Sequence, residues 1–201
     1  MKTIKYMVGK VNMFDFVSKE IAREVMTGVY HENGYKIASD GKILFAVKSD
    51  YTEELEERCL MPDGNVKELE YPKWKQVCPF YGAEFNEQEW MDIPVLCDEF
   101  TEWVKNNRAI KRDVYGKSKT WYDEWAVYGG GCSFFKAQPY YTFSHAAKSI
   151  CADSFHIHKE RPFCAFAKSD LGCVLIMPIF MTEEVASQKI EDEEIDVFPL
   201  I

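Results

Sequence analysis

Hydrophobic positions near the N-terminus follow first a helical and then an alternating spacing. Apolar residues recur every three or four positions at Phe14, Val17, Ile21 and Val25. With Asn12 as N-cap and Gly28 just past the end, this spacing predicts an amphipathic helix over residues 13–26. A β-rich run at 3–8 precedes it. Three further strands are predicted at 29–31, 35–38 and 43–47. The Asn33-Gly34 pair between the first two is typical of a tight hairpin turn.

The same order of elements recurs between residues 133 and 181. Residues 140–143 have strand-like composition, and Ser144 is placed to cap a short helix that runs to Cys151. Strands are then predicted at 155–158, 163–167 and 173–177. The match lies in the order of elements and not in residue identity, and it indicates an internal repeat.

Residues 52–132 differ in character from both repeats. They are acidic at first, with a helix predicted over 96–106, and Gly129-Gly130-Gly131 is typical of a flexible joint. We interpret them as an insertion. The predicted organisation is one α+β domain with a first half at 1–51, an inserted segment at 52–132, a second half at 133–181 and an acidic tail at 182–201.

Composition narrows the class of protein. Of the 201 residues 47% are hydrophobic and 28% charged, which is typical of a globular chain. No apolar run approaches the ~18 residues of a membrane span, so no membrane partner and a cytoplasmic location are expected. The net charge of −9 disfavours a nucleic-acid partner. Residues 104–119, however, carry six basic side chains and one acidic one, and a local field decides what binds there.

Candidate chemistry is sparse. The seven cysteines include no Cys-x-x-Cys pair, so they predict neither disulfides nor zinc, and we expect buried thiols. His156 and His158 share one face of a strand and could chelate a metal, but no third ligand stands at a diagnostic offset. No nucleophile or metalloprotease motif is present. We therefore predict no enzyme activity, no catalytic residue, no cofactor and no metal.

Three segments resemble the bacterial DNA polymerase sliding clamp, the β subunit. Arg23-Glu24-Val25-Met26-Thr27-Gly28-Val29 is similar to the clamp's Arg-Pro-x-Leu-x-Gly-Val. Residues 38–44, Ala-Ser-Asp-Gly-Lys-Ile-Leu, resemble its Ala-Thr-Asp-Gly-His-Arg-Leu. Residues 174–179, Val-Leu-Ile-Met-Pro-Ile, resemble its C-terminal Val-Met-Pro-Met strand. Ile43 and Phe180 stand where the family has arginine.

The resemblance implies a DNA-clamp-like fold, a duplicated β-α-β-β-β domain with a central α+β insertion. Clamp helices face DNA, so helix residues and the basic segment become predicted contacts to duplex DNA: Lys19, Arg23, Lys105, Arg108, Lys111, Arg112, Lys117, Lys119 and Lys148. His145 lies in the same predicted helix as Lys148. In the family the second and third of these segments line a groove for partner peptides. The corresponding residues here are Asp40, Gly41, Lys42, Leu44, Met177, Pro178 and Ile179. Since those segments come from adjacent domains of a clamp, a head-to-tail homo-oligomer could rebuild the groove between chains.

The acidic tail contains its own candidate ligand. Glu194 and the four residues after it resemble the Gln-Leu-x-Leu-Phe peptides that bind clamps, and the matching positions are Ile195, Asp196, Val197 and Phe198. An ordinary docking tail is the alternative.

Two functions follow from these patterns. The first is a non-enzymatic, clamp-like, DNA-associated protein, a replication accessory or processivity factor. It would contact double-stranded DNA without regard to sequence, and its partners would be replication proteins or its own copies. The alternative is a protein-interaction module on a clamp fold that has lost DNA binding and keeps a clamp-binding-like C-terminal peptide.

Overall fold

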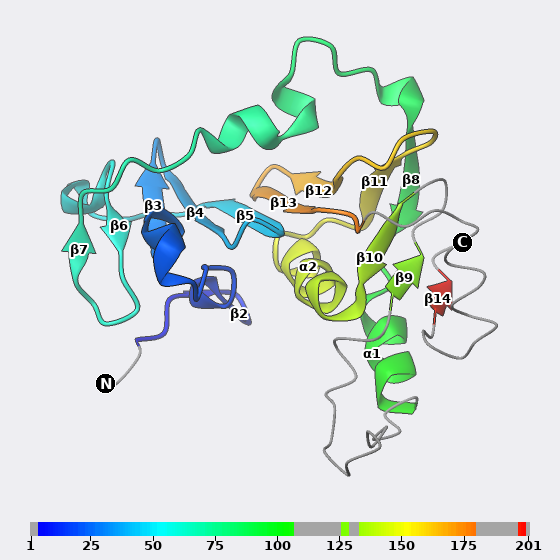
Figure 1. Ribbon diagram of the computed structural model, residues 1–201, viewed down its shortest axis with the longest axis horizontal. Coiled ribbons are helices and arrows are strands. Elements are labelled where there is room, and N and C mark those ends of the chain that lie inside the picture. The colour runs from blue at the N-terminus through cyan, green and yellow to red at the C-terminus, as the bar shows by residue number, and fades with distance from the viewer. Residues whose placement is uncertain (1–3, 107–125, 129–132, 180–196, 200–201) are drawn as a thin grey trace.

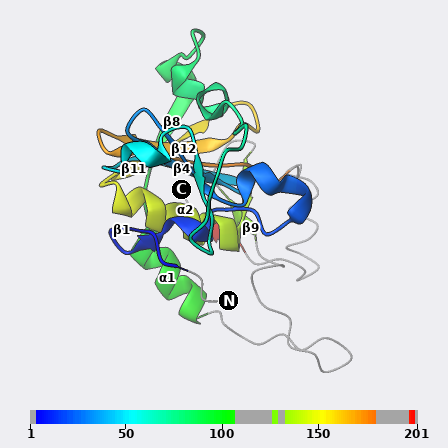
Figure 2. The same cartoon turned by 90° about the vertical axis from the view of Figure 1, so that its left-hand side faces the viewer.

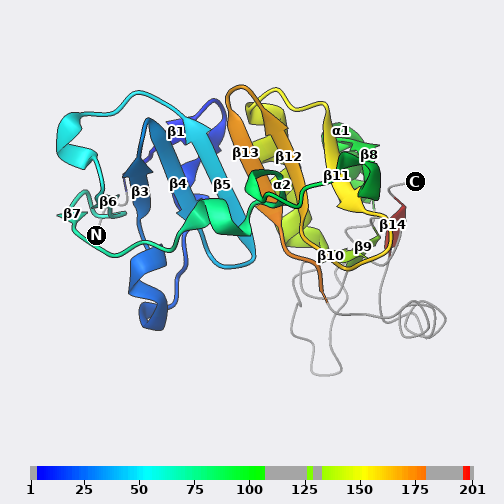
Figure 3. The same cartoon turned by 90° about the horizontal axis from the view of Figure 1, so that it is seen from above.

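A nine-stranded antiparallel sheet forms the centre of the molecule (Figures 1 and 3). The computed structural model describes residues 4–106, 126–128, 133–179 and 197–199. The strand order in the sheet is β7-β6-β3-β4-β5-β13-β12-β11-β8. Two α-helices and the N-terminal segment cover one face, which we call the helix side (Figure 2). The other face, the outer side, is crossed by short 3-10 helices (Figure 3).

Two sets of three strands meet at the middle of the sheet. The first set is β3 (Val29–Glu32), β4 (Tyr35–Ser39) and β5 (Ile43–Lys48). The second is β11 (Ser154–His158), β12 (Ala165–Ser169) and β13 (Gly172–Ile176). Strands β5 and β13 pair in register from Val47 opposite Gly172 to Ile43 opposite Ile176. All six strands were predicted from the sequence. Asn33 and Gly34 have φ values of 51° and 78°, as the predicted hairpin turn requires.

Residues 52–106 extend the sheet at both ends. Strands β6 (Cys59–Leu60) and β7 (Val66–Lys67) add to β3, and β8 (Trp90–Pro94) adds to β11. The 3-10 helices between them are η3 (Glu53–Leu55), η4 (Trp74–Val77), η5 (Pro79–Tyr81) and η6 (Glu87–Glu89). Residues 52–106 are therefore integrated into the main sheet.

The remaining strands of the described residues form two smaller sheets. Strands β1 (Met7–Val8) and β2 (Val11–Asn12) form a hairpin, shorter than the strand predicted at 3–8. Strand β9 (Ala126–Tyr128) pairs with β10 (Phe134–Lys136) on one edge and, in parallel, with β14 (Val197–Pro199) on the other. The predicted glycine joint at 129–131 lies outside the described residues.

Helix α1 (Cys97–Asn106) confirms the helix predicted over 96–106. Helix α2 (Ala137–Ser149) differs from the prediction for this part of the chain. Residues 140–143, predicted as a strand, form the middle of α2, and Ser144 is inside the helix and not its cap. The side chains that α2 buries follow a helical period: Ala137, Tyr140, Phe143, Ser144, Ala146 and Ala147. Burial against the sheet therefore outweighs the local β propensity of the aromatic run.

The helix predicted over 13–26 is wrong. In its place are two 3-10 helices, η1 (Met13–Asp15) and η2 (Ile21–Met26), and Arg23 inside η2 has non-helical φ/ψ angles of −113° and 45°. Met13, Phe14, Phe16 and Val17 are all buried, and a single helical stripe could not bury four nearly consecutive side chains. Asn12 does cap η1, accepting from the Phe14 amide.

Gly28, predicted as a left-handed cap, has another role. It is not one of the glycines with positive φ. A Cβ there would lie 2.8 Å from the Met61 sulfur and 3.0 Å from the Leu60 carbonyl oxygen. Glycine is therefore required at position 28 because the β6 segment passes too close to leave room for a side chain.

The sheet separates two hydrophobic cores. On the helix side Phe45, Phe143 and Phe155 pack with their neighbours, and on the outer side Leu44, Trp74 and Phe166 do so. Cys59, Cys78, Cys97, Cys164 and Cys173 are buried, as predicted, whereas Cys151 is exposed. Within the described ranges, no helix has the length and apolar character needed to span a membrane.

Candidate nucleic-acid interface

A cavity of about 800 Å³ opens on the helix side, between the β1–β2 hairpin, η1 and α2. We call it the helix-side cavity. Three lysines line it from three separate segments. Lys10 lies in the β1–β2 turn, where Gly9 has a φ of 56°; Lys19 lies between η1 and η2; and Lys148 lies in the last turn of α2. Three lysines that are remote from one another in the sequence thus line one cavity.

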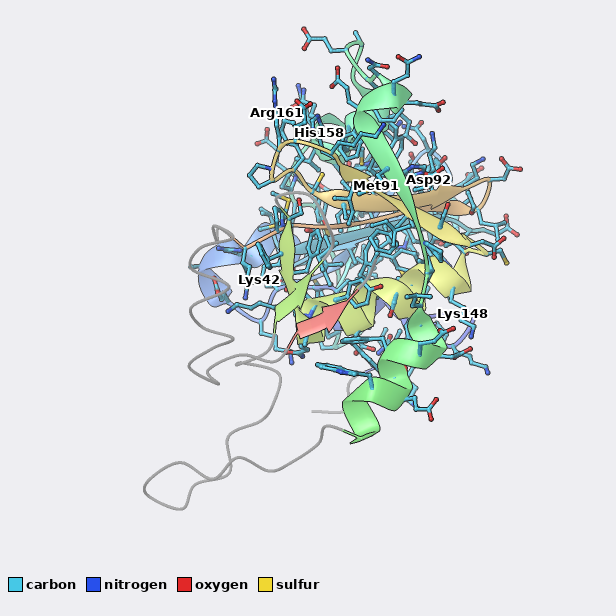
Figure 4. All side chains as sticks on the ribbon, turned by 90° about the vertical axis from the view of Figure 1, so that its right-hand side faces the viewer. Lys42, Met91, Asp92, Lys148, His158 and Arg161 are labelled. Carbon is cyan, nitrogen blue, oxygen red and sulfur yellow. The ribbon has the colours of Figure 1, made fainter. Side chains whose placement is uncertain are left out.

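Carboxylates partly offset this charge. Asp15 also lines the cavity. The Nζ of Lys148, which is labelled in Figure 4, lies 2.6 Å from Oδ2 of Asp98 in α1. Both side chains are largely exposed. The hydrogen bond between them raises the pKa of Lys148 and lowers that of Asp98, so both stay charged. Three lysines against two carboxylates leave a modest positive excess.

His145 also lines the cavity. Its Nε2 is shielded from solvent and has no hydrogen-bond partner among the described residues. The Tyr141 ring lies beside it, with 4.3 Å between the ring centroids. Burial, followed by the charge of Lys148, lowers the pKa of His145, so its imidazole is neutral at pH 7. The cavity wall therefore contains an aromatic pair, whereas the Nε2 atom of His145 is enclosed by protein.

The structure brings together only some of the predicted DNA contacts. Lys19 and Lys148 share the helix-side cavity. The Lys105 side chain and the residues from Arg108 to Lys119 lie outside what is described. Sequence reasoning missed Lys10, because its position depends on the β1–β2 turn bringing it against α2.

Arg23 lies apart from the cavity lysines. Its Nη1 donates to the Asp40 carbonyl oxygen at 2.9 Å, and its Nε lies 3.1 Å from the Glu20 carboxylate. Lys19 and Arg23 were both predicted to lie in the helix over 13–26, but Lys19 precedes η2 and Arg23 lies inside it. Arg23 instead contacts the turn that resembles a clamp motif.

The two segments predicted to form a peptide groove are neighbours within one chain. The Met177 amide donates to the Lys42 carbonyl at 2.7 Å, so their proximity needs no second copy. The Asp40 carboxylate shapes the turn by accepting from the amides of Lys42 and Ile43 at 2.8 and 2.9 Å. Leu44 is buried, whereas the Met177 side chain is 51% exposed.

The rest of this predicted groove surrounds that junction. Gly41 lies in the turn with a φ of 86°. Pro178 is half-buried, and the Ile179 amide donates to the Phe134 carbonyl at 2.7 Å. Of the tail peptide, Ile195 and Asp196 lie outside the described residues, while the backbone of Val197 and Phe198 pairs with β9.

His156 and His158 each face a carboxylate that the sequence did not connect to them. His156 Nδ1 lies 2.6 Å from Asp92, and His158 Nε2 lies 3.4 Å from Glu89, because β8 pairs with β11. Asp92 and His158 are labelled in Figure 4. Burial lowers the pKa of His156. The described residues contain no group of three or more side chains placed to hold a metal ion.

Solved structures with a similar fold are bacterial β sliding clamps. A β sliding clamp from C. crescentus matches with a TM-score of 0.57 at 11% sequence identity. A Helicobacter pylori β clamp bound to a DNA ligase peptide matches with a TM-score of 0.51 at 9% identity. A DNA polymerase III β subunit structure from Eubacterium rectale gives 0.50 at 12%.

The chain has a clamp-like fold. The predicted resemblance is confirmed at this level, with 84% of the chain matched in each case. The clamp-like chain spans 62%, 61% and 61% of the three clamps' own lengths. No protein-family profile matches its sequence. No curated protein matches it either.

Proposed function

We propose that this protein is a non-enzymatic, DNA-associated protein that contacts duplex DNA through its helix side without reading sequence. The observation that carries the proposal is the convergence of Lys10, Lys19 and Lys148 on one cavity of a clamp-like fold. Ammonium groups on flexible side chains recognise phosphates, and they carry no sequence information. The net charge of −9 does not oppose this, because local charge governs docking.

The basic segment belongs to the same proposal. It follows α1, and α1 packs on α2 through Phe100 against Tyr140 and through the Asp98–Lys148 pair. The segment is therefore attached to the helix side at its start. We assign it the remaining phosphate contacts: Lys105, Arg108, Lys111, Arg112, Lys117 and Lys119. Arg23 remains a predicted contact, but its guanidinium is already bound to Asp40 and Glu20, so we expect it to contribute less.

The clamp likeness supports a role as a replication accessory factor. In that interpretation residues 1–51 and 133–181 are two copies of one unit, with 52–132 inserted between them. A ring would require several copies of the chain, because one chain spans about three fifths of a clamp.

The test is the salt dependence of duplex binding. Fluorescence anisotropy with labelled 20-base-pair duplexes of two unrelated sequences, at 50 to 200 mM salt, should give equal affinities that fall steeply with salt. Neutralising two phosphate contacts lowers the slope of log K against log salt by about 1.8. We therefore expect Lys10→Gln with Lys19→Gln to flatten the slope by that amount. Lys73→Gln, at an exposed position before η4 on the outer side, is the matched control. Equal slopes for both variants would refute the proposal.

A second candidate function is peptide binding at the junction of Lys42 and Met177. It is favoured by the exposed Met177 side chain beside the Asp40–Lys42 turn, and by the peptide bound to the similar Helicobacter pylori clamp. The tail peptide, Ile195 to Phe198, would then bind a clamp or another copy of this chain. Pull-down with a polymerase clamp, with and without residues 190–201, tests the tail. An unchanged yield would eliminate its role.

A further inference from the structure

We propose that Tyr6 is a pH-sensitive anchor for the β1–β2 hairpin. Tyr6 holds the hairpin, and with it Lys10, against strands β3 and β4, and protonation of His31 releases it. The inference rests on the proposed function in one respect, because Lys10 is one of the phosphate contacts proposed there. It adds a control of the helix-side cavity by proton concentration, which duplex contact alone does not require.

The Tyr6 side chain contacts two residues that are neighbours on adjacent strands. Its hydroxyl lies 2.9 Å from Nε2 of His31 in β3, and Nζ of Lys36 in β4 lies 4.3 Å from the centre of its ring. His31 and Lys36 are directly opposite each other in the register of the two strands. Both are buried, and Tyr6 packs against the helix-side core. Tyr6 therefore covers both side chains on the helix side of the sheet.

Tyr6 is also joined to the base of the hairpin. Its carbonyl accepts from the Met13 amide at 2.8 Å, and its amide donates to Oδ1 of Asn12 at 3.0 Å. Tyr6 directly precedes β1, Met13 directly follows β2, and Lys10 lies in the turn between the two strands. A movement of Tyr6 away from the sheet would therefore displace the hairpin and Lys10 with it.

The contacts of His31 suit a neutral imidazole. Its Nδ1 donates to the Arg58 carbonyl at 3.1 Å, so Nε2 of the neutral ring accepts from the Tyr6 hydroxyl. A protonated ring carries hydrogen on both nitrogens, so the hydroxyl would have to turn and accept, and its own hydrogen would lose its acceptor. The imidazolium would also lie beside the Lys36 ammonium on a buried face, where like charges repel more strongly than in water.

The surroundings of His31 compensate little for a positive charge. The titratable groups that face it are Tyr6, Lys36, Tyr51 and Glu56. The Glu56 carboxylate already accepts from the Tyr51 hydroxyl. Burial, followed by the charge of Lys36, lowers the pKa of His31, and the Arg58 carbonyl and Glu56 only partly oppose this. Movement of Tyr6 away from the sheet would let water hydrate both cations.

The direction and size of the effect follow from the two protonation equilibria. With Tyr6 released, water reaches His31 and its pKa returns toward the ordinary value of 6.5, whereas with Tyr6 bound the pKa is lower. Release is therefore coupled to proton uptake and becomes easier as the pH falls below 6.5. A released state that titrates at 6.5 is favoured up to about tenfold more at pH 5.5 than at pH 7.5.

Hydrogen exchange of the full chain at pH 7.5 and 5.5 tests the release directly. After correction for intrinsic exchange rates, the protection of amides in residues 4–12 should fall about tenfold at pH 5.5. His31→Gln should abolish this fall, and His156→Gln, which removes an imidazole elsewhere, should leave it intact. Exchange of residues 4–12 should also be insensitive to low concentrations of urea, which separates local release from global unfolding.

Duplex binding at pH 7.5 and 50 mM salt connects the anchor with Lys10. Lys10→Gln should weaken binding about threefold in the otherwise unchanged chain and less than about 1.5-fold in a Tyr6→Ala background, because the released hairpin no longer holds Lys10 beside the cavity. Lys19→Gln is the matched control. Lys19 lines the same cavity but lies outside the hairpin, so its substitution should cost the same in both backgrounds. Tyr6→Phe, which loses the hydroxyl and keeps the ring, should give an intermediate result.

The outcomes separate this inference from the proposed function. Equal protection of residues 4–12 at both pH values, or a fall that persists in His31→Gln, would overturn the pH-sensitive anchor. Equal effects of Lys10→Gln with Tyr6 and with alanine at this position would overturn the role of Tyr6 in positioning Lys10. Absence of duplex binding by the unchanged chain would refute the proposed function, while the exchange measurement would still decide whether His31 controls the hairpin.

Discussion

The guanidinium group of Arg23 donates to the main-chain carbonyl of Asp40 at 2.9 Å. These two residues belong to the two neighbouring segments that resemble clamp motifs. This contact is structural and requires no partner. Arg23 braces one side of the Asp40–Lys42 turn, and on the other side the Lys42 carbonyl accepts from the Met177 amide. The conformation of the predicted peptide groove therefore depends on a residue that the sequence suggested would contact DNA.

Gly41→Ala is expected to disturb this brace. Gly41 has a φ of 86°, and an added Cβ would lie 2.7 Å from Arg23 Nη1. Placing alanine at positive φ costs about 1–2 kcal/mol, and displacement of Arg23 adds to this. Gly34→Ala is the matched control, because Gly34 has a φ of 78° but no atom within 4 Å of the new Cβ. In urea unfolding Gly41→Ala should lose more free energy of unfolding than Gly34→Ala. The excess should vanish in an Arg23→Met background, and an excess that persists would contradict the brace.

Gly172→Ala is expected to separate the two halves of the sheet. A Cβ at Gly172 would lie 2.3 Å from the Ala46 carbonyl oxygen and 2.8 Å from the Val47 Cα, and both obstacles are backbone. Relief requires β5 and β13 to move apart at their first pair. We expect a loss of about 3 kcal/mol in the free energy of unfolding. Thermal unfolding by circular dichroism measures it, and a loss equal to that of Gly34→Ala would show that the register at this pair is looser than described.

Elements fixed by local chemistry were predictable from the sequence, whereas elements fixed by tertiary burial were not. The hairpin at Asn33-Gly34 depends on two residues that tolerate positive φ, so it can be predicted locally. Helix α2 was missed because residues 140–143 have strand-like composition. Its register is set by a buried face that includes Ala137, Ser144 and Ala147, which only contact with the sheet selects.

The residues of the candidate site also include some that the sequence could identify and some that only the tertiary structure reveals. Lys19 and Lys148 could be identified because the resemblance to clamps implies that basic residues of the two predicted helices face DNA. Lys10 could not, because the Gly9 turn has to bring it against α2. Asp98 could not either, since it is fifty residues from the lysine that it binds. Interactions across that separation depend on how α1 packs, which no local pattern encodes.

Asp98→Asn is expected to strengthen DNA binding. The substitution removes the carboxylate that lies 2.6 Å from Lys148 Nζ and leaves the lysine free to reach a phosphate. We expect affinity for a duplex at 50 mM salt to rise two- to fivefold, with a slope of log K against log salt that is steeper by about 0.9. Glu84→Gln, an exposed acidic position between η5 and η6, removes the same charge elsewhere and controls for net charge. An equal gain for both variants would assign the effect to net charge alone.

Stability should fall as the pH drops below about 6.5, partly because of His31. This side chain is fully buried; its Nδ1 donates to the Arg58 carbonyl at 3.1 Å, so its Nε2 accepts from the Tyr6 hydroxyl at 2.9 Å. Burial lowers the pKa of His31 from its ordinary value of 6.5. Just below pH 6.5, His31 is therefore protonated in the unfolded chain but not in the folded chain. Protonation favours the unfolded chain, so the free energy of unfolding falls as the pH decreases.

The free energy of urea unfolding at pH 7.5, 6.5 and 5.5 measures this effect. His31→Gln should lower stability at pH 7.5, because two hydrogen bonds are disturbed, and should also reduce the pH dependence. His156→Gln provides the comparison, since its pKa is lowered too but its side chain is only half-buried. If the slope between pH 7.5 and 5.5 were unchanged in His31→Gln, His31 would not be the group that titrates.

Tyr140→Phe is expected to stabilise the protein. The Tyr140 side chain is fully buried between α1, α2 and the sheet, in contact with the rings of Phe100, Phe143 and Phe155. Its hydroxyl has no hydrogen-bond partner in the ranges that the structure describes. An unsatisfied buried hydroxyl costs about 1–3 kcal/mol, so its removal without loss of ring packing should raise the free energy of unfolding by about 1 kcal/mol. Tyr6→Phe should do the opposite, because the Tyr6 hydroxyl donates to His31 at 2.9 Å. Urea unfolding at pH 7.5 compares the two, and a loss of stability in Tyr140→Phe would mean that a water or a residue beyond the described ranges satisfies the hydroxyl.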